Sequence, residues 1–150
     1  MKRFVWRLQR VLDVKAKQEE IRRIELFRLT EKLAGKQGEL LMRQRVLQDI
    51  LDGLSQDKSP GRLPAQEFFL RQAATSDEQI RRLKSEIAEL EVRRKEKTAD
   101  LLALRRSRES LERLRAEARE QFMREQEKLE QKELDDRSTV AFARKESIKG

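Results

Sequence analysis

Residues 53–64 read Gly-Leu-Ser-Gln-Asp-Lys-Ser-Pro-Gly-Arg-Leu-Pro and interrupt a chain of 150 residues that otherwise favours helix. This stretch holds both prolines of the sequence and two of its five glycines. Pro60 and Pro64 each bias the preceding residue away from helix, and Pro64 also fits the first turn of a following helix. The expected parts are a helix at about residues 4–54, a turn at about 55–63, a helix at about 64–139 and a C-terminal tail at about 140–150, all in a single coiled-coil rod over residues 1–150.

An apolar repeat with alternating spacings of three and four residues runs on both sides of this break. Seven of the nine repeat positions just upstream of the break are apolar, which is typical of a two-stranded coiled coil. Farther upstream the repeat meets Lys15, Glu19 and Arg22, and Ile21 and Ile24 lie beside that polar gap. We therefore expect the apolar stripe to shift around the helix there. The nine positions are Leu26, Leu29, Leu33, Lys36, Leu40, Arg43, Leu47, Ile50 and Leu54, and the second segment continues with Phe69, Ala73, Ser76, Ile80, Leu83, Ile87, Leu90, Leu101, Leu104, Leu111, Ala118, Phe122 and Leu129.

The short connection predicts an all-α fold in which two long helices form an antiparallel coiled-coil hairpin. In a hairpin that is symmetric about the break, residue i faces about residue 118 − i, so Leu33 is expected near Ser85 and Phe4 near Leu114. Everything after about Arg115 then has no partner within the chain. We expect a monomer; a parallel homodimer of long helices is the alternative.

The composition excludes most catalytic chemistry. Charged residues make up 43% of the chain and hydrophobic residues 37%, with no His and no Cys. Without these two residue types there is no imidazole base, no thiolate nucleophile and no Cys/His zinc site. A site built from carboxylates alone would need a concave pocket, which a thin rod lacks. We therefore predict a protein that is not an enzyme, with no catalytic, cofactor-binding or metal-binding residues. No stretch of about 18 apolar residues is present, so we expect no transmembrane segment.

Charge is unevenly spread along the chain, whose formal net charge is +8. Residues 1–17 contain six basic side chains against the single acid Asp13, residues 117–136 carry eight acids and four bases, and residues 137–150 are basic again. An antiparallel hairpin brings the basic N-terminus and the acidic stretch together at its open end. Nucleic-acid binding is the alternative interpretation of this basic charge. It is disfavoured because Glu is interleaved with Lys and Arg almost throughout and no aromatic stacking platform is present.

Several segments resemble a known family. The opening Phe4-Val-Trp-Arg-Leu-Gln-Arg-Val-Leu-Asp-Val-Lys15, followed by Glu19-Glu20, is similar to the start of the FliJ family of flagellar export proteins. Leu111-Glu-Arg-Leu114 and the closing Glu130-Gln-Lys-Glu-Leu-Asp-Asp136 resemble the same family. The length and the hairpin plan also fit, so the resemblance spans nearly the whole chain. The N-terminal block is its most specific part.

The resemblance implies a soluble, stalk-like part of the flagellar type III protein export apparatus, similar to the central stalk of rotary ATPases. Its implied partners are the hexameric export ATPase, whose ring takes up the end of the rod, the cytoplasmic domain of the export gate, and export chaperones. The implied role is to couple ATP hydrolysis to protein translocation for flagellum biogenesis, and hence motility and chemotaxis. The implied location is cytoplasmic, with peripheral association with the membrane export apparatus. A stalk protein of a virulence injectisome is the alternative.

Two partner-binding surfaces are predicted on this basis. At the open end, Phe4 and Trp6 either cap the coiled coil or anchor a partner, since Trp and Arg are favoured at binding hot spots. Beside the turn, Phe68 lies off the seam and is expected on the surface, whereas Phe69 lies on the seam and is expected in the core. The residues predicted to bind the ATPase are Phe4, Trp6, Arg7, Arg10, Lys15, Phe122 and Leu129, and those predicted to bind the export gate are Leu51, Leu54 and Phe68.

Overall fold

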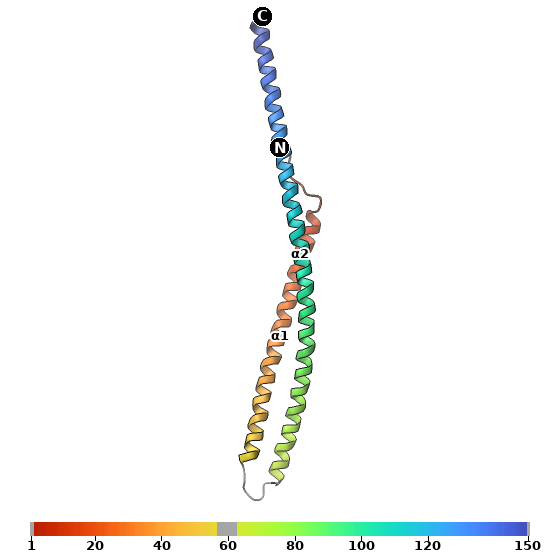
Figure 1. Cartoon of the computed structure of the whole chain (residues 1–150), viewed down its shortest axis with the longest axis vertical. Helices are drawn as coiled ribbons and strands as arrows, with labels where there is room; N and C mark the ends of the chain where they lie inside the picture. Colours follow the sequence, from red (N-terminus) through yellow and green to blue (C-terminus); the bar gives the residue numbers. More distant parts are fainter. Residues whose placement is uncertain (1, 57–62, 150) are drawn as a thin grey trace. The chain divides into compact units, whose positions relative to one another are not determined.

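The computed structural model describes residues 2–56 and 63–149. They form two long helices, α1 (Gln9–Gln56) and α2 (Leu63–Lys149), which pack against each other in opposite directions (Figure 1). No strand occurs in these two ranges. The predicted all-α hairpin of two long helices is therefore confirmed. The predicted turn falls mainly on residues 57–62, which lie outside the described residues.

Helix α1 begins at Gln9, not at about residue 4 as predicted. Residues 2–6 are not helical, and the amide of Gln9 donates a hydrogen bond to the carbonyl oxygen of Trp6 at 3.2 Å. The segment before Gln9 offers no Ser, Thr, Asp or Asn that could cap a helix. Its basic side chains also oppose the positive end of a helix dipole. Both effects disfavour an earlier start.

Helix α2 continues to Lys149, so the predicted non-helical tail is wrong over residues 140–149. These ten residues contain neither Gly nor Pro, and basic side chains such as Arg144 and Lys145 are favoured near the C-terminal end of a helix. At the other end, α2 begins at Leu63 and Pro64 lies in its first turn, as predicted.

The chain divides into two compact units, and each helix contributes to both. The hairpin unit is Glu19–Ala103, in which α1 and α2 run side by side (Figure 1). The terminal unit consists of Met1–Gln18 together with Leu104–Gly150.

The apolar seam forms the core of the hairpin unit. Leu33 is only 2% exposed and packs with Ile87 and Leu90, while Leu29 and Leu40 lie against this cluster. All nine repeat positions predicted upstream of the break are buried or half-buried, which confirms the seam in α1. Buried apolar surface contributes roughly 25 cal/mol per Å², so this stripe supplies much of the stability of the unit.

Polar contacts between the helices show which residues of α1 and α2 face each other in the hairpin unit. Lys36 Nζ lies 3.1 Å from Glu86 Oε2, and Lys97 Nζ lies 3.0 Å from Glu25 Oε2. The residue numbers in each pair add to 122, so the symmetric register of 118 is wrong by about one helical turn. Ser85 is accordingly exposed and does not face Leu33. The midpoint of the break therefore does not set the register.

The polar gap upstream does not shift the apolar stripe. Glu19 is 3% exposed and occupies the seam position, whereas Ile21 and Ile24 are exposed. The predicted shift is therefore wrong, because Ile21 and Ile24 do not replace the seam residues. Lys15 and Glu19 stay half-buried and buried, respectively, although they are charged, while Arg22 is exposed. Arg23 offsets part of the cost of burying the Glu19 carboxylate, because its Nη2 donates a hydrogen bond to Glu19 Oε1 at 3.3 Å.

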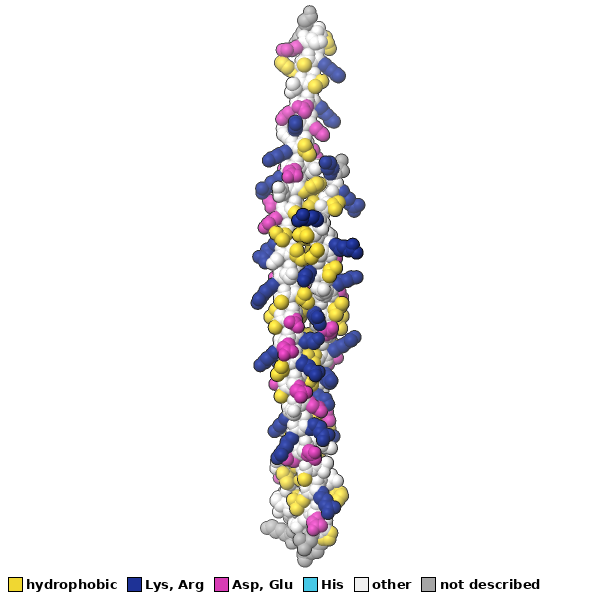
Figure 2. All heavy atoms as spheres, turned by 90° about the vertical axis from the view of Figure 1, so that its right-hand side faces the viewer, with side chains coloured by type: hydrophobic (Ala, Val, Ile, Leu, Met, Phe, Trp, Pro, Cys, Tyr) yellow, Lys and Arg dark blue, Asp and Glu magenta, His cyan; other side chains and the backbone are white. Residues whose placement is uncertain are grey.

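Charged side chains of both signs cover the face of the molecule seen in Figure 2. Many form ion pairs one turn apart along the same helix, each of which stabilises a helix by about 0.2–0.5 kcal/mol. These pairs support long helices that have little apolar surface. They include Arg81 with Asp77, Arg82 with Glu78, Arg105 with Glu109, Arg108 with Glu112 and Arg124 with Glu120.

The register can be tested with paired cysteines, since the natural sequence has none. Lys36→Cys with Glu86→Cys is expected to be joined within one chain by a short bismaleimide at high dilution, because these side chains meet across the helices. In Lys36→Cys with Arg82→Cys, the two cysteines would face each other if residue i faced residue 118 − i, as predicted from the sequence. This pair is expected to react far less. Mass spectrometry of the monomer band measures the yield of each. Equal yields, or a higher yield for the second pair, would contradict the register.

Candidate functional site

We call residues 2–17 of the terminal unit the N-terminal segment. Its start is held on α2 by an aromatic contact. The rings of Phe4 and Phe122 have centroids 5.5 Å apart at an angle of 51°. The guanidinium carbon of Arg115 lies 5.7 Å from the centroid of the Phe4 ring, within the range of a cation–π interaction. Arg115 Nε also donates a hydrogen bond to Gln9 Oε1 at 2.7 Å, which joins the start of α1 to the same place on α2.

This contact corrects two predictions about the open end. Phe4 packs against Phe122, about two helical turns beyond the predicted Leu114. The reason is that residues 2–6 are not helical, and a non-helical chain can advance about 3.3 Å per residue compared with about 1.5 Å in a helix. The unpartnered part of α2 therefore does not begin after Arg115. Phe122 and Gln126 are still half-buried, and exposure is continuous only from residue 127.

The structure brings together some of the predicted ATPase-binding residues and leaves others apart. Phe4 and Phe122 are in contact, and Trp6 is half-buried two residues along the chain. Arg7 and Arg10 are exposed. The remaining two differ in burial: Lys15 is half-buried, and Leu129 is 51% exposed.

Arg115 and Gln9 belong to this site but were not predicted. The apolar repeat of the second segment contains Leu111, Ala118 and Phe122. Position 115 falls between them in the same spacing. The sequence therefore places a basic residue, Arg115, on the apolar seam, and this pattern could have indicated that Arg115 belongs to the site. Nothing in the local sequence singles out Gln9, because its contact with α2 depends on where the non-helical segment ends.

The basic side chains of the N-terminal segment are available to a partner. Within residues 2–56 and 63–149 none of them forms an ion pair, whereas the only acid of the segment, Asp13, accepts a hydrogen bond from Gln9 Nε2 at 3.0 Å. Unpaired cations beside half-buried aromatic rings form a surface suited to an acidic partner. The basic residues are Lys2, Arg3, Arg7, Arg10, Lys15 and Lys17.

The turn end of the hairpin unit carries a second surface. Phe68 is 58% exposed, as predicted, and its ring meets the ring of Phe69 at a centroid distance of 5.8 Å in an edge-on arrangement. Phe69 is itself 43% exposed, so its predicted place in the core is wrong. In the observed register it faces Gly53, which has no side chain to cover it. Leu51 is exposed and Leu54 is half-buried.

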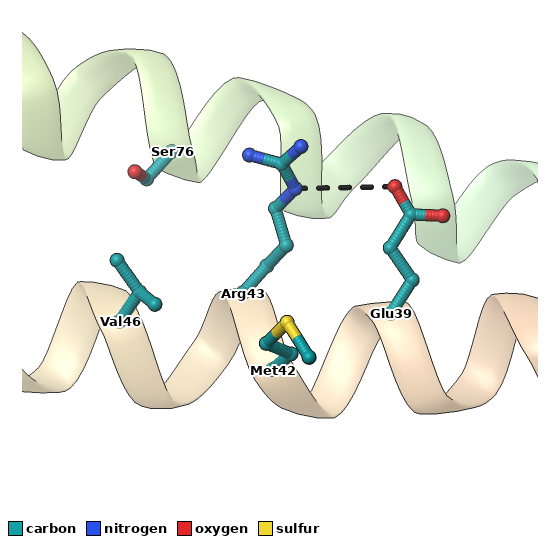
Figure 3. Close-up of a pocket in the computed structure, with 5 residues that line it drawn as sticks. All are labelled: Glu39, Met42, Arg43, Val46 and Ser76. Atoms are coloured by element: carbon teal, nitrogen blue, oxygen red, sulfur yellow. Dashed lines mark ion pairs between the residues drawn. The ribbon is translucent and has the colours of Figure 1, made fainter.

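Two open grooves follow one side of the same unit. A groove of about 460 Å³ is lined by residues that include Leu54, Gly53 and Phe69, and it shares Val46 with a neighbouring groove of about 400 Å³. In the groove of about 400 Å³, the Arg43 side chain reaches from α1 toward α2, and its Nε lies 4.0 Å from Glu39 Oε1 (Figure 3). The Ser76 side chain on α2 is short and leaves space beside Arg43. Exposed apolar grooves rimmed by polar residues mark interaction surfaces.

The described residues offer neither a metal site nor a membrane span. Across residues 2–56 and 63–149, no group of three or more acidic side chains is placed to hold a metal ion. In the described part of the chain, neither helix is long and apolar enough to cross a membrane.

Comparison with known proteins identifies the family. A family model described as Flagellar FliJ protein matches residues 3–147. The chain belongs to the FliJ family. No curated protein and no solved structure matches it significantly. The matched range contains every residue predicted above for partner binding, from Phe4 to Leu129. A FliJ-family chain is related to flagellar protein export, and the family is a non-enzymatic component of that system.

In this FliJ-family chain the aromatic contact can be followed with Trp6, the only tryptophan. Phe4→Ala is expected to release the N-terminal segment, because an aromatic pair contributes about 0.5–1.5 kcal/mol beyond its buried area. The fluorescence of Trp6 should then shift to longer wavelength and be quenched more strongly by acrylamide. The control is Phe142→Ala, which removes an exposed ring of the same unit and should leave the spectrum unchanged. Identical spectra for Phe4→Ala and the natural chain would contradict the contact.

Proposed function

We propose that this FliJ-family chain is a stalk-like component of the flagellar type III export apparatus. In this proposal its terminal unit binds the ring of the hexameric export ATPase, and the turn end of its hairpin unit binds the cytoplasmic domain of the export gate. The chain, acting as one coiled-coil rod, thereby couples ATP hydrolysis to protein translocation. It also binds export chaperones, and it works in the cytoplasm at the membrane export apparatus.

The terminal unit supports the ATPase assignment most strongly. It combines a basic N-terminal segment without ion pairs in the described residues and a stretch of α2 whose apolar side chains, such as Leu129, are exposed. A ring closing around this unit would bury those apolar side chains and place acidic groups opposite Arg7 and Arg10. Charge would mainly govern encounter and orientation, and apolar anchors would supply more of the affinity.

Stimulation of the export ATPase tests this assignment. Arg7→Glu with Arg10→Glu is expected to abolish stimulation, because both side chains are exposed and the change reverses the charge of the surface. Truncation after Gln126 is expected to do the same while keeping the contact between Phe4 and Phe122. The hydrolysis rate at increasing concentrations of each chain is the measurement.

The matched control is Arg28→Glu with Lys32→Glu, which makes the same change in charge on exposed residues of the hairpin unit. This variant should stimulate the ATPase as well as the natural chain does. Circular dichroism should show α1 and the remaining α2 helical in all variants. Full stimulation by the chain truncated after Gln126 would place the ATPase contact elsewhere.

The turn end supports the gate assignment through Leu51, Leu54 and Phe68. Phe68→Ala is expected to weaken binding to the isolated gate domain by about tenfold, a typical effect for an interface anchor. Its helicity should stay nearly unchanged, because the ring is exposed. Phe27→Ala removes an equally exposed ring of the same unit and should bind normally. Titration calorimetry measures both, and loss of helicity in Phe68→Ala would instead make this residue part of the core.

A further inference from the structure

The last part of α2, residues 127–149, is a helix without a described partner in the chain. We call it the free segment. Every residue from 127 to 148 is exposed, and the hydrogen bonds found here lie within the segment, such as the one from Thr139 Oγ1 to the carbonyl oxygen of Asp135. At about 1.5 Å per residue the free segment is roughly 35 Å long. Helices in proteins gain most of their stability from packing, so a partner would stabilise this segment.

Charge divides the free segment into two blocks of opposite sign. Residues 127–136 hold five acids and two bases, a net charge of −3. Residues 137–149 hold four bases and one acid, a net charge of +3. Such a helix is complementary to itself in one direction only. Two parallel copies would place acid against acid and base against base, whereas two antiparallel copies place each acidic block against a basic block.

Apolar side chains are present on both blocks. Leu129 and Leu134 belong to the acidic block, and Val140, Phe142 and Ile148 belong to the basic block, and all five are exposed. A shallow, nearly flat hollow between side chains lies just past the change of sign. It is lined by Asp136, Arg137, Val140, Ala141 and Arg144.

We propose that the free segment binds the free segment of a second copy of this chain, in antiparallel orientation and with its two-fold axis close to Ser138. In this arrangement Leu134 of each copy lies at the hollow beside Val140 and Ala141 of the other. Glu130 of each copy lies near Arg144 and Lys145 of the other. The contact is isologous, so it closes as a dimer and does not extend into a filament.

The pairing concerns the free segment alone and leaves the hairpin of each chain intact. It makes the isolated chain a dimer in place of the monomer predicted from its sequence. The interface is short, and its ion pairs are exposed, so the affinity is modest and depends on ionic strength. Raising the salt from about 0.05 M to about 0.5 M shortens the Debye length from roughly 14 Å to roughly 4 Å and should dissociate the dimer.

Charge reversal and charge exchange provide the decisive test, with the full chain in analytical ultracentrifugation at low salt. Glu130→Lys with Glu133→Lys makes both blocks positive, and Arg144→Glu with Lys145→Glu makes both blocks negative. Each variant alone is expected to have a dissociation constant at least about tenfold higher than the natural chain. An equimolar mixture of the two is expected to regain dimers, because their blocks are again opposite in sign.

A matched control separates this effect from net charge. Glu89→Lys with Glu91→Lys makes the same change in charge on exposed residues of the hairpin unit and should leave dimerisation unchanged. Orientation is tested with uncharged positions that meet in the proposed pair: Leu134→Cys should be crosslinked to Ala141→Cys in a mixture, but not to a second Leu134→Cys chain. A natural chain that stays monomeric at low salt, reversals without effect, or crosslinking of Leu134→Cys to itself would each overturn the proposal. The ring in the proposed function would cover the same stretch of α2, so the pairing concerns the isolated chain. ATPase stimulation is a separate readout, and failure of this pairing leaves the proposed function untouched.

Discussion

A narrow apolar seam between two antiparallel helices is the interaction on which the other features depend. Leu33, Ile87 and Leu90 are buried where the helices meet, while charged side chains occupy most other positions. Because a coiled coil needs only this stripe, a chain with 43% charged residues can still form ordered structure. The narrow seam also leaves many side chains on the outside of the helices, where a partner can reach them.

Polar residues on and beside the seam determine how the helices align. Lys97 from α2 and Arg22 from α1 both donate hydrogen bonds to the Glu25 carboxylate, and these bonds lower its pKa. A lowered pKa means that the contribution of Glu25 to stability is present at neutral pH and is lost as the pH falls through the pKa of the folded state. Such pairs add little energy at an exposed surface, but a shifted register would separate them. They therefore favour one alignment over its neighbours.

The two ends of the fold differ in how they leave apolar groups exposed. At the turn end, Gly53 faces Phe69 and leaves it uncovered, which opens a groove between the helices. In the terminal unit, Phe4 covers Phe122, but nothing described covers α2 beyond Gln126. The second of these surfaces exists because α2, at 87 residues, is much longer than α1, at 48 residues.

The sequence by itself determined the fold class, the place of the break and the seam of α1, because spacing and proline effects are local. It also marked Phe4, Phe122 and Phe68 as candidate site residues. Only the tertiary structure decided the register, the burial of Glu19 and the pairing of Phe4 with Phe122. These depend on how far a non-helical segment reaches and on which side chains meet across two helices. Such contacts join residues far apart in the sequence, such as Phe4 with Phe122 and, 106 positions apart, Gln9 with Arg115, and no local pattern encodes them.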